Sequence, residues 1–363
     1  MSTTDSTRSR TQLPYQALAA DLREHVVGEV RFDPGSRAAY STDASNYRQV
    51  PIGVVVPRNP DAAAAAIEVC RKHEVPLLSR GGGTSLAGQC CNAAVVIDWS
   101  KYCTGVVSVD SGAGTAVVEP GIKLDVLNDR LRPSGWMVGP KPSTHVSCTI
   151  GGMIGNNSCG STAQAYGKMA DSVRRLEIQT YDGLRMWVGP TGEHEFARIV
   201  AEGGRRADIY AGLKVIIDDY ADDIRDRFPD IPRRVSGYNI DKLLPENGFD
   251  LAKTLVGSES SLITVLHAEI ELVRIPPANA LAILGFTDIA AAADAVPTVV
   301  EHSPAALEGL DHRLVELEHS RRLAEKALRQ LPDGAAWLMV QFDGANQDEA
   351  DHKAKQMIDH LHR

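Results

Sequence analysis

The sequence lacks a run of about 18 uninterrupted apolar residues, the length that a membrane-spanning helix needs. Its first residues, MSTTDSTRSRTQ, are polar and no apolar segment follows them, so we expect no transmembrane segment and no secretory signal. A basic stripe is also missing, because 47 acidic residues outnumber 38 basic ones and the formal net charge is −9. These absences argue against an integral membrane protein and against a nucleic-acid partner.

Cysteine pairs with metal-ligand spacing are absent too. The six cysteines are scattered without C-x-x-C or cysteine–histidine spacing. We interpret them as reduced thiols that mostly pack inside a cytoplasmic protein, and we predict no metal site in this chain. His360 and His362 stand two residues apart, which places them on different faces of a helix and argues against a shared metal ion.

What is present is the composition of an ordinary globular protein. Hydrophobic residues make up 43% and charged residues 23% of the 363 residues, and this length favours two domains. Pro276-Pro277 is the best boundary, because beyond it strands and helices alternate simply up to the end of the chain. We therefore expect a disordered tail over 1–14, a first domain over 15–275 and a second domain over 276–363.

The most informative stretch of the first domain is VPLLSRGGGTSLAGQ, residues 75–89. A β-branched strand at 52–56, a helix from Asp61 to His73 and a strand at 75–78 form a β-α-β unit that leads into this glycine loop. Three consecutive glycines let backbone N–H groups converge on an anion such as a diphosphate, with Arg80 as a counter-charge. The alternative is a tight turn without a ligand. The spacing matches neither G-x-G-x-x-G nor a P-loop, which excludes both nucleotide-binding folds.

A second unusual stretch runs from Val138 to Gly167 and is rich in Gly, Ser, Thr and Asn. It has little apolar periodicity, so it reads as a long loop, and a loop of this length inside a compact domain is normally functional or disordered. Function is favoured, because Ile150, Met153 and Ile154 are interleaved with its glycines and need a core to pack in.

Four segments in this order resemble the FAD-linked oxidases of the vanillyl-alcohol oxidase, or p-cresol methylhydroxylase, type. They are PLLSRGGGTSLAGQ, PSTHVSCTIGGMIGNNSCGS, RRVSGYNID and GSESSLITVLHAEIEL. The chain looks most like the branch of glycolate oxidase, D-lactate dehydrogenase and D-2-hydroxyglutarate dehydrogenase. The resemblance implies an α+β fold, in which a two-subdomain FAD-binding domain over 15–275 is followed by an incomplete α/β cap domain over 276–363.

The resemblance also assigns cofactor-binding residues. The glycine loop would hold the FAD diphosphate, the second stretch would line the flavin and its ribityl chain, and the last segment would form the adenine-side wall. A flat flavin ring needs close approach of backbone on one face, and glycines permit it. The residues are Arg80, Gly81, Gly82, Gly83, Thr84, Ser85, Gly88, Gln89, Pro142, Ser143, Thr144, Gly151, Gly152, Gly155, Asn156, Ser158, Glu259 and Ile263.

Three features depart from the family pattern. Thr84 stands where members with covalent flavin often have a histidine, so we expect non-covalent FAD. The family motif G-S-E-G-T reads GSESS, so Ser260 replaces a glycine, which narrows the backbone options and is expected to weaken cofactor binding. The H-x-G-D-G-N motif of the cap, which supplies metal ligands and substrate contacts in this branch, is missing. We therefore expect a C-terminal segment or subunit to complete the enzyme, and slow turnover by this chain alone.

Three residues are candidates for catalysis. His145 can contact the flavin or the substrate, or it can serve only hydrogen bonding within its loop. Arg233 and Tyr238 can bind a substrate carboxylate or orient the ring, and the alternatives are an ion pair with an acid and a packed tyrosine.

The implied activity is FAD-dependent oxidation of a small D-2-hydroxy acid, such as D-lactate, D-2-hydroxyglutarate or glycolate. Hydride would pass from the α-carbon to N5 of the flavin, and the electrons would then go to an unknown acceptor. Two alternatives stay open: a flavin-binding subunit or remnant without turnover of its own, and a reductase of the UDP-N-acetylenolpyruvoylglucosamine type. The extended PSTH stretch and the helical cap favour 2-hydroxy-acid oxidation and the flavin-binding subunit over the reductase.

Overall fold

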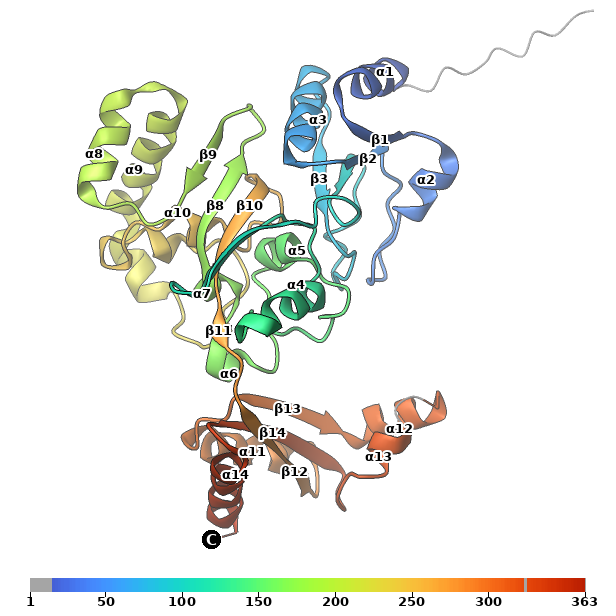
Figure 1. The fold of residues 1–363 in the computed structure, drawn as a ribbon, viewed down its shortest axis with the longest axis vertical. Helices are drawn as coiled ribbons and strands as arrows, with labels where there is room; N and C mark the ends of the chain where they lie inside the picture. Colours follow the sequence, from blue (N-terminus) through green and yellow to red (C-terminus); the bar gives the residue numbers. More distant parts are fainter. Residues whose placement is uncertain (1–14, 323–324, 363) are drawn as a thin grey trace, which may run out of the picture.

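The computed structural model describes residues 15–322 and 325–362, so the tail predicted over 1–14 lies outside the described residues. Figure 1 shows the described chain as two α/β layers side by side, with a smaller sheet and its helices at one end. Within the described ranges, no helix combines the length and the apolarity that crossing a membrane requires.

The first sheet carries the predicted β-α-β unit. Three of its strands are parallel, and the fourth, β1, pairs antiparallel with β2, in the order β1-β2-β4-β3. All residues of β2 and β4 are buried because apolar clusters cover both faces of the sheet. The elements are α1 (Gln16–His25), β1 (Gly28–Arg31), α2 (Pro34–Ala39), β2 (Gly53–Pro57), α3 (Pro60–Lys72), β3 (Leu77–Arg80) and β4 (Val95–Asp98). Asn59 caps α3, since its side chain accepts a hydrogen bond from the N–H of Ala62.

The second sheet is antiparallel throughout, in the order β5-β6-β10-β8-β9. Its central strand, β10, comes late in the sequence and is inserted between β6 and β8. The strands are β5 (Val106–Asp110), β6 (Thr115–Val118), β8 (Val173–Gln179), β9 (Arg185–Val188) and β10 (Thr264–Glu271). A large apolar cluster joins this sheet to its helices. The other elements are α4 (Leu124–Leu131), β7 (Trp136–Met137), α5 (Ile150–Asn156), α6 (Ala163–Tyr166), α7 (Met169–Ser172), α8 (Glu193–Glu202), α9 (Gly204–Arg227), α10 (Leu251–Leu255) and β11 (Val273–Arg274).

The third sheet lies at the lower end of the molecule in Figure 1, beyond β11. Its three strands are antiparallel, in the order β12-β14-β13, and α11 and α14 pack on one face around a small core of their own. The elements are β12 (Ala278–Phe286), α11 (Ile289–Glu301), β13 (Ala306–Asp311), α12 (His312–Ser320), α13 (Glu325–Leu328), β14 (Ala336–Gly344) and α14 (Gln347–Leu361). α12 and α13 are separate helices, because α12 ends at Ser320 and Arg322 takes a left-handed φ of +57°. The domain division at 275/276 stays a prediction.

Glu29 on β1 is held by three donors at the edge of the first sheet. Lys101 Nζ lies 2.5 Å and Tyr102 Oη 2.6 Å from its Oε1, and Arg31 pairs with its other oxygen. The hydrogen bonds from Lys101, Tyr102 and Arg31 lower the pKa of Glu29 from 4.5 to about 2. A carboxylate with a lowered pKa contributes stability that is fully present above pH 4.5 and is lost as the pH falls towards 2.

We therefore expect Glu29→Gln to lower the thermal midpoint by about 2–4 °C at pH 7, and we expect this difference to shrink as the pH falls from about 4.5 towards 2. Circular dichroism melts of both proteins over this pH range measure it. Glu24→Gln, at an exposed position of α1, is the matched control and should leave the midpoint unchanged at every pH. An equal drop for Glu29→Gln at pH 7 and at pH 2.5 would contradict the assignment.

Candidate active site

The main cavity has a volume of about 410 Å³, within the range of sites that bind small molecules and cofactors. Three segments that are far apart in sequence form its walls: the glycine loop after β3, residues 142–159 around α5, and the turn between α10 and β10. In Figure 1, α5 lies between the first sheet and the second. The cavity therefore lies where the two halves of the first domain meet.

The glycine loop passes very close to the backbone before α5. A Cβ atom at Gly82 would lie 2.2 Å from the carbonyl oxygen of Ser147, and one at Gly81 would lie 2.1 Å from Oγ1 of Thr149. Gly83 has a φ of +65°, which side chains disfavour. All three glycines are thus required by the fold of the loop itself, and a side chain at Gly82 would displace the loop rather than fill the cavity.

The same loop presents backbone donors that have no protein acceptor. Within the ranges that the structure describes, the N–H groups of Gly81, Gly82, Gly83 and Thr84 donate to no other protein group. Backbone N–H groups rarely stay unpaired unless water or a ligand accepts from them. A run of such donors at a cavity wall fits an anion such as a diphosphate. Arg80 is the one cationic side chain that the structure describes in the lining, so the backbone N–H groups are the main donors that an anion can meet there.

Arg80 supports the loop rather than offering a free counter-charge. Its guanidinium donates to the carbonyl oxygens of Cys90 and Thr42, each at 2.7 Å, and more weakly to that of Tyr40 at 3.5 Å. Hydrogen bonds from a charged donor are among the stronger ones in proteins. Arg80 therefore ties the glycine loop to the segment before β2, and the loop's backbone remains the main group that can meet an anion.

The second wall is helical where a loop was expected. Residues 150–156 form α5 and 163–166 form α6, so the prediction of a loop across 138–167 is wrong there. Thr149 caps α5, since its Oγ1 accepts from the N–H of Gly152 at 3.2 Å. Ile150, Met153 and Ile154 are buried in the core below, which confirms that they pack and leaves the glycine face of the helix towards the cavity.

Gly155 differs from the other glycines of this wall. A Cβ atom there would have no neighbour nearer than Cα of Glu259 at 3.9 Å, whereas one at Gly151 would lie 2.6 Å from Cβ of Pro120. Gly155 lines the cavity, so nothing in the protein itself demands a glycine at this position. The missing side chain leaves room that a flat ligand can occupy, which agrees with a flavin ring lying against α5.

The third wall is the turn Gly257–Ser261. Three of its residues have left-handed φ angles: Gly257 at +89°, Glu259 at +49° and Ser260 at +65°. Gln89 Nε2 donates to Oε1 of Glu259 at 3.0 Å, and Ser85 Oγ donates to Oε1 of Gln89. This chain of hydrogen bonds links the glycine loop to the turn across the cavity.

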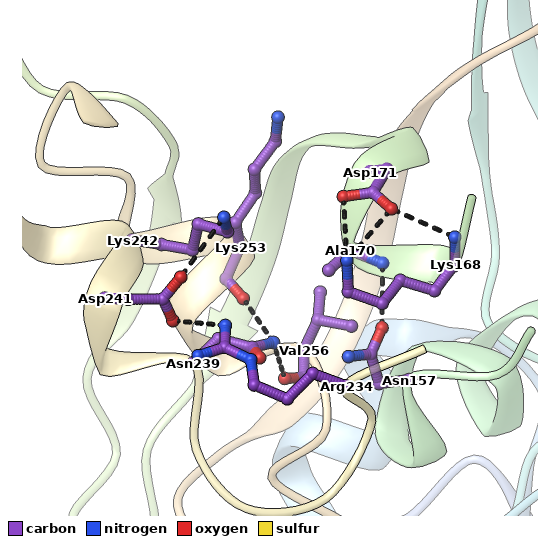
Figure 2. Close-up of polar contacts among 10 residues, drawn as sticks. All are labelled: Asn157, Lys168, Ala170, Asp171, Arg234, Asn239, Asp241, Lys242, Lys253 and Val256. Carbon is purple, nitrogen blue, oxygen red and sulfur yellow. Dashed lines mark hydrogen bonds and ion pairs between the residues drawn. The ribbon is translucent and has the colours of Figure 1, made fainter. Parts of the chain in front are cut away.

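Polar contacts fix the backbone just before this turn, as Figure 2 shows for Lys253 and Val256. Asn239 Nδ2 donates to the carbonyl oxygens of Lys253 at 3.2 Å and Val256 at 2.9 Å, which fixes the VSGYN segment against α10. Arg234 pairs with Asp241 at 2.6 Å, and both side chains are largely buried. Removing one partner of such a buried pair lowers the stability of the fold. The pair therefore anchors the backbone on both sides of Asn239.

On the other side of the turn, Asn157 ends α5 in the left-handed conformation and is fully buried. Its Oδ1 accepts from the N–H of Ala170 at 3.0 Å, which ties α5 to α7 (Figure 2). Lys168 and Asp171 form an ion pair at 3.0 Å beside this contact. Side chains that do not face the cavity thus fix these two walls to the elements behind them.

The structure brings the predicted cofactor residues together. All of them line the cavity except Gly88, which lies in a neighbouring hollow with Tyr47 and Arg48. Their roles in FAD binding stay predictions. The structure gathers them because the glycine loop, α5 and the 257–261 turn meet at one place.

The three catalytic candidates lie elsewhere: none of them lines the cavity. His145 Nδ1 is 2.8 Å from Asp125 of α4. Arg233 donates to the carbonyl oxygen of Gly160 at 2.8 Å, and Tyr238 pairs with Oγ of Ser261 at 2.8 Å. Each of these side chains has a hydrogen-bonding partner, but His145 contacts α4 rather than its own loop, and Tyr238 is exposed rather than packed. The roles of all three residues therefore stay predictions.

Several lining residues escaped the sequence reasoning. Thr149 was detectable, since a threonine before I-G-G is a helix cap signal. Trp99, Pro120 and Val265 come from distant segments whose local sequence carries no sign of the site. Cys90 and Cys148 also line the cavity, and burial raises the pKa of both thiols, so neither is a thiolate at neutral pH.

We expect Gly155→Leu to abolish FAD retention without unfolding the protein, because the new side chain enters the cavity and leucine favours a helix. Gly212→Leu in α9 is the matched control: it is a helical glycine with no atom within 4 Å of its Cβ position, and it should keep full FAD content. Flavin absorbance per chain and far-UV circular dichroism measure the two effects. A Gly155→Leu protein that retains one FAD would show that the ring does not lie there.

We expect Ser260→Gly to stabilise the protein by about 1 kcal/mol, because it relieves a left-handed φ, and to tighten FAD binding. Ser108→Gly on the exposed edge strand β5 serves as the control and should cost about 0.5–1 kcal/mol, since glycine there only adds unfolded-state entropy. Urea unfolding measures both changes. If Ser260→Gly destabilised the protein as much as Ser108→Gly, the backbone at Ser260 would not be strained.

Two family profiles match the chain. The first, described as FAD binding domain, matches residues 51–189, and the second, described as FAD linked oxidases, C-terminal domain, matches residues 275–363. Together they cover more than half of the chain.

Individual proteins and structures agree with these profiles. D-2-hydroxyglutarate dehydrogenase of Pseudomonas putida is 27% identical over 92% of this chain, and the match covers 34% of that protein. Glycolate oxidase subunit GlcD of Bacillus subtilis is 28% identical over 90% of this chain and 60% of that subunit. The chain thus spans only about a third of the first relative's length.

A solved structure of alkyldihydroxyacetonephosphate synthase superposes with a TM-score of 0.68 at 17% identity, over 96% of this chain and 59% of that one. At this identity the likeness shows the fold alone. The two profiles, matched in order along one chain, show that the protein belongs to the FAD-linked oxidases and carries an FAD-binding domain followed by their C-terminal domain.

Proposed function

We propose that the protein is an FAD-dependent oxidoreductase that oxidises a small 2-hydroxy acid of the D-2-hydroxyglutarate, D-lactate or glycolate type. The observation that carries this proposal is the cavity with unpaired N–H donors at Gly81–Thr84 on one wall and the open Gly155 on another. Bound FAD would accept a hydride from the α-carbon of the acid at N5. The names of the relatives, D-2-hydroxyglutarate dehydrogenase and glycolate oxidase subunit GlcD, support the substrate class.

The residues of this chain would bind and orient the cofactor. The glycine-loop N–H groups and the hydroxyls of Thr84 and Ser85 would hold the diphosphate, and α5 would support the flavin ring. The 257–261 turn would close the far side, tied to the loop through Gln89 and Glu259. Thr84 carries no imidazole for covalent attachment, so this binding would be non-covalent.

A flavin-binding subunit without turnover of its own is the second candidate. The observation in its favour is that His145, Arg233 and Tyr238 do not line the cavity, so no candidate base faces the ring position. In that case a C-terminal segment or a separate subunit would supply the substrate-binding groups, and one relative is itself named a subunit.

The cytoplasmic location expected from the reduced thiols stays part of the proposal.

The test is anaerobic reduction of the FAD-loaded protein by D-2-hydroxyglutarate, D-lactate and glycolate, followed as bleaching of the flavin absorption band. We expect slow bleaching by one of these acids with the chain alone and fast bleaching once the C-terminal segment of a longer relative is added. In a parallel sample, denaturation should release the flavin into solution.

No bleaching by any 2-hydroxy acid, with or without the added segment, would overturn the proposed activity. Rapid bleaching by the chain alone would rule out the subunit alternative. It would also show that the catalytic base lies among the residues around the cavity. Flavin that stays on the denatured protein would refute non-covalent binding.

A further inference from the structure

Two histidines that are 58 residues apart in sequence meet on the C-terminal domain. Nε2 of His302 lies 3.0 Å from Nδ1 of His360, and the two rings stand edge to face with centroids 5.3 Å apart. His302 is the C-cap residue directly after α11, and His360 lies in the last turn of α14. No local sequence pattern pairs His360 with His302, because only the fold brings these two residues together.

The separation of the two nitrogens suits a shared metal ion. Zinc binds imidazole nitrogen at about 2.0–2.1 Å, so two imidazoles on one tetrahedral ion have nitrogens about 3.3 Å apart. The observed 3.0 Å is close to this value. Without an ion, one ring donates its N–H to the other. A metal replaces that proton once both rings turn slightly to aim a lone pair at a common point, and their position at the surface leaves room for this turn.

The surroundings favour a cation. The C-terminal ends of α11 and α14 meet at this pair, and a helix C-terminus carries partial negative charge from its last carbonyl groups. Glu301 and Asp359, each next to one of the histidines in sequence, are exposed carboxylates that add negative charge. His360 is exposed and His302 half-buried, so water molecules have access to complete the coordination.

We propose that His302 and His360 form a binding site for a divalent transition-metal ion of the zinc, nickel or copper class. These ions prefer imidazole ligands, whereas Mg²⁺ and Ca²⁺ prefer oxygen ligands. Among the described residues no third His, Cys, Asp or Glu converges with the pair, so the ion has two protein ligands and binds reversibly. The site is separate from the FAD cavity, whose lining stops at Val265 and includes no residue of the C-terminal domain.

Such an ion would join the ends of two helices that pack on the same sheet. α11 and α14 contact each other and cover one face of β12 and β14. An ion that binds only the folded state stabilises that state by mass action. The consequence is a C-terminal domain whose thermal stability rises with Zn²⁺, independently of whether FAD is bound.

The experiment is calorimetric titration of the FAD-loaded full chain with Zn²⁺, with Ni²⁺ as a second probe. We expect one site that His302→Ala and His360→Ala each weaken at least tenfold. His352→Ala and His362→Ala are the matched controls, and both variants should bind Zn²⁺ like the wild type. Each removes an exposed histidine: His352 lies within α14, and His362 directly follows it. Mg²⁺ should give no signal at this site.

Circular dichroism melts with Zn²⁺ and then with a chelator are the second readout. Zn²⁺ should raise the midpoint of the wild type and of the controls, and the chelator should reverse it. His360→Gln, which keeps a polar side chain of similar length, replaces the alanine variant if that one unfolds. Equal Zn²⁺ affinity in wild type and in His302→Ala, or an equal loss in the controls, would overturn the site.

Discussion

The close approach between the glycine loop and the backbone at Ser147–Thr149 is the constraint on which the rest of the site depends. At this approach Gly81 and Gly82 have no space for a Cβ atom, so the loop must be glycine and its N–H groups turn away from protein acceptors. Arg80 uses its charge on carbonyl oxygens behind the loop. The backbone N–H groups are thereby left available for an anion, so a cavity with one cationic side chain can still suit a diphosphate.

The opposite wall is fixed by a different kind of interaction. The 257–261 turn holds left-handed angles at Glu259 and Ser260, and such angles persist only where surrounding contacts over-determine them. Those contacts are the bonds from Asn239 to the carbonyl oxygens of Lys253 and Val256, and the link from Gln89 to Glu259. The turn is thus held from behind by buried amides and in front by the glycine loop, so the two walls share their stability.

Local signals in the sequence predicted those parts of the fold that local interactions determine. The β-α-β unit before Arg80 and the alternation beyond Pro277 follow from apolar runs and caps, and the structure contains both. α5 was not predicted, because a segment so rich in glycine has low helix propensity. It becomes helical only by burying Ile150, Met153 and Ile154. No local pattern places β10 between β6 and β8, nor His145 beside Asp125, because both depend on how distant segments pack.

We propose that one FAD molecule contacts the glycine loop, α5 and the 257–261 turn together. Hydrogen–deuterium exchange of the apo protein with and without added FAD measures this directly. We expect slower exchange at residues 81–85, 151–156 and 257–261 in the presence of FAD, and no change in α9. Protection limited to one of the three segments, or absent from the glycine loop, would contradict the account.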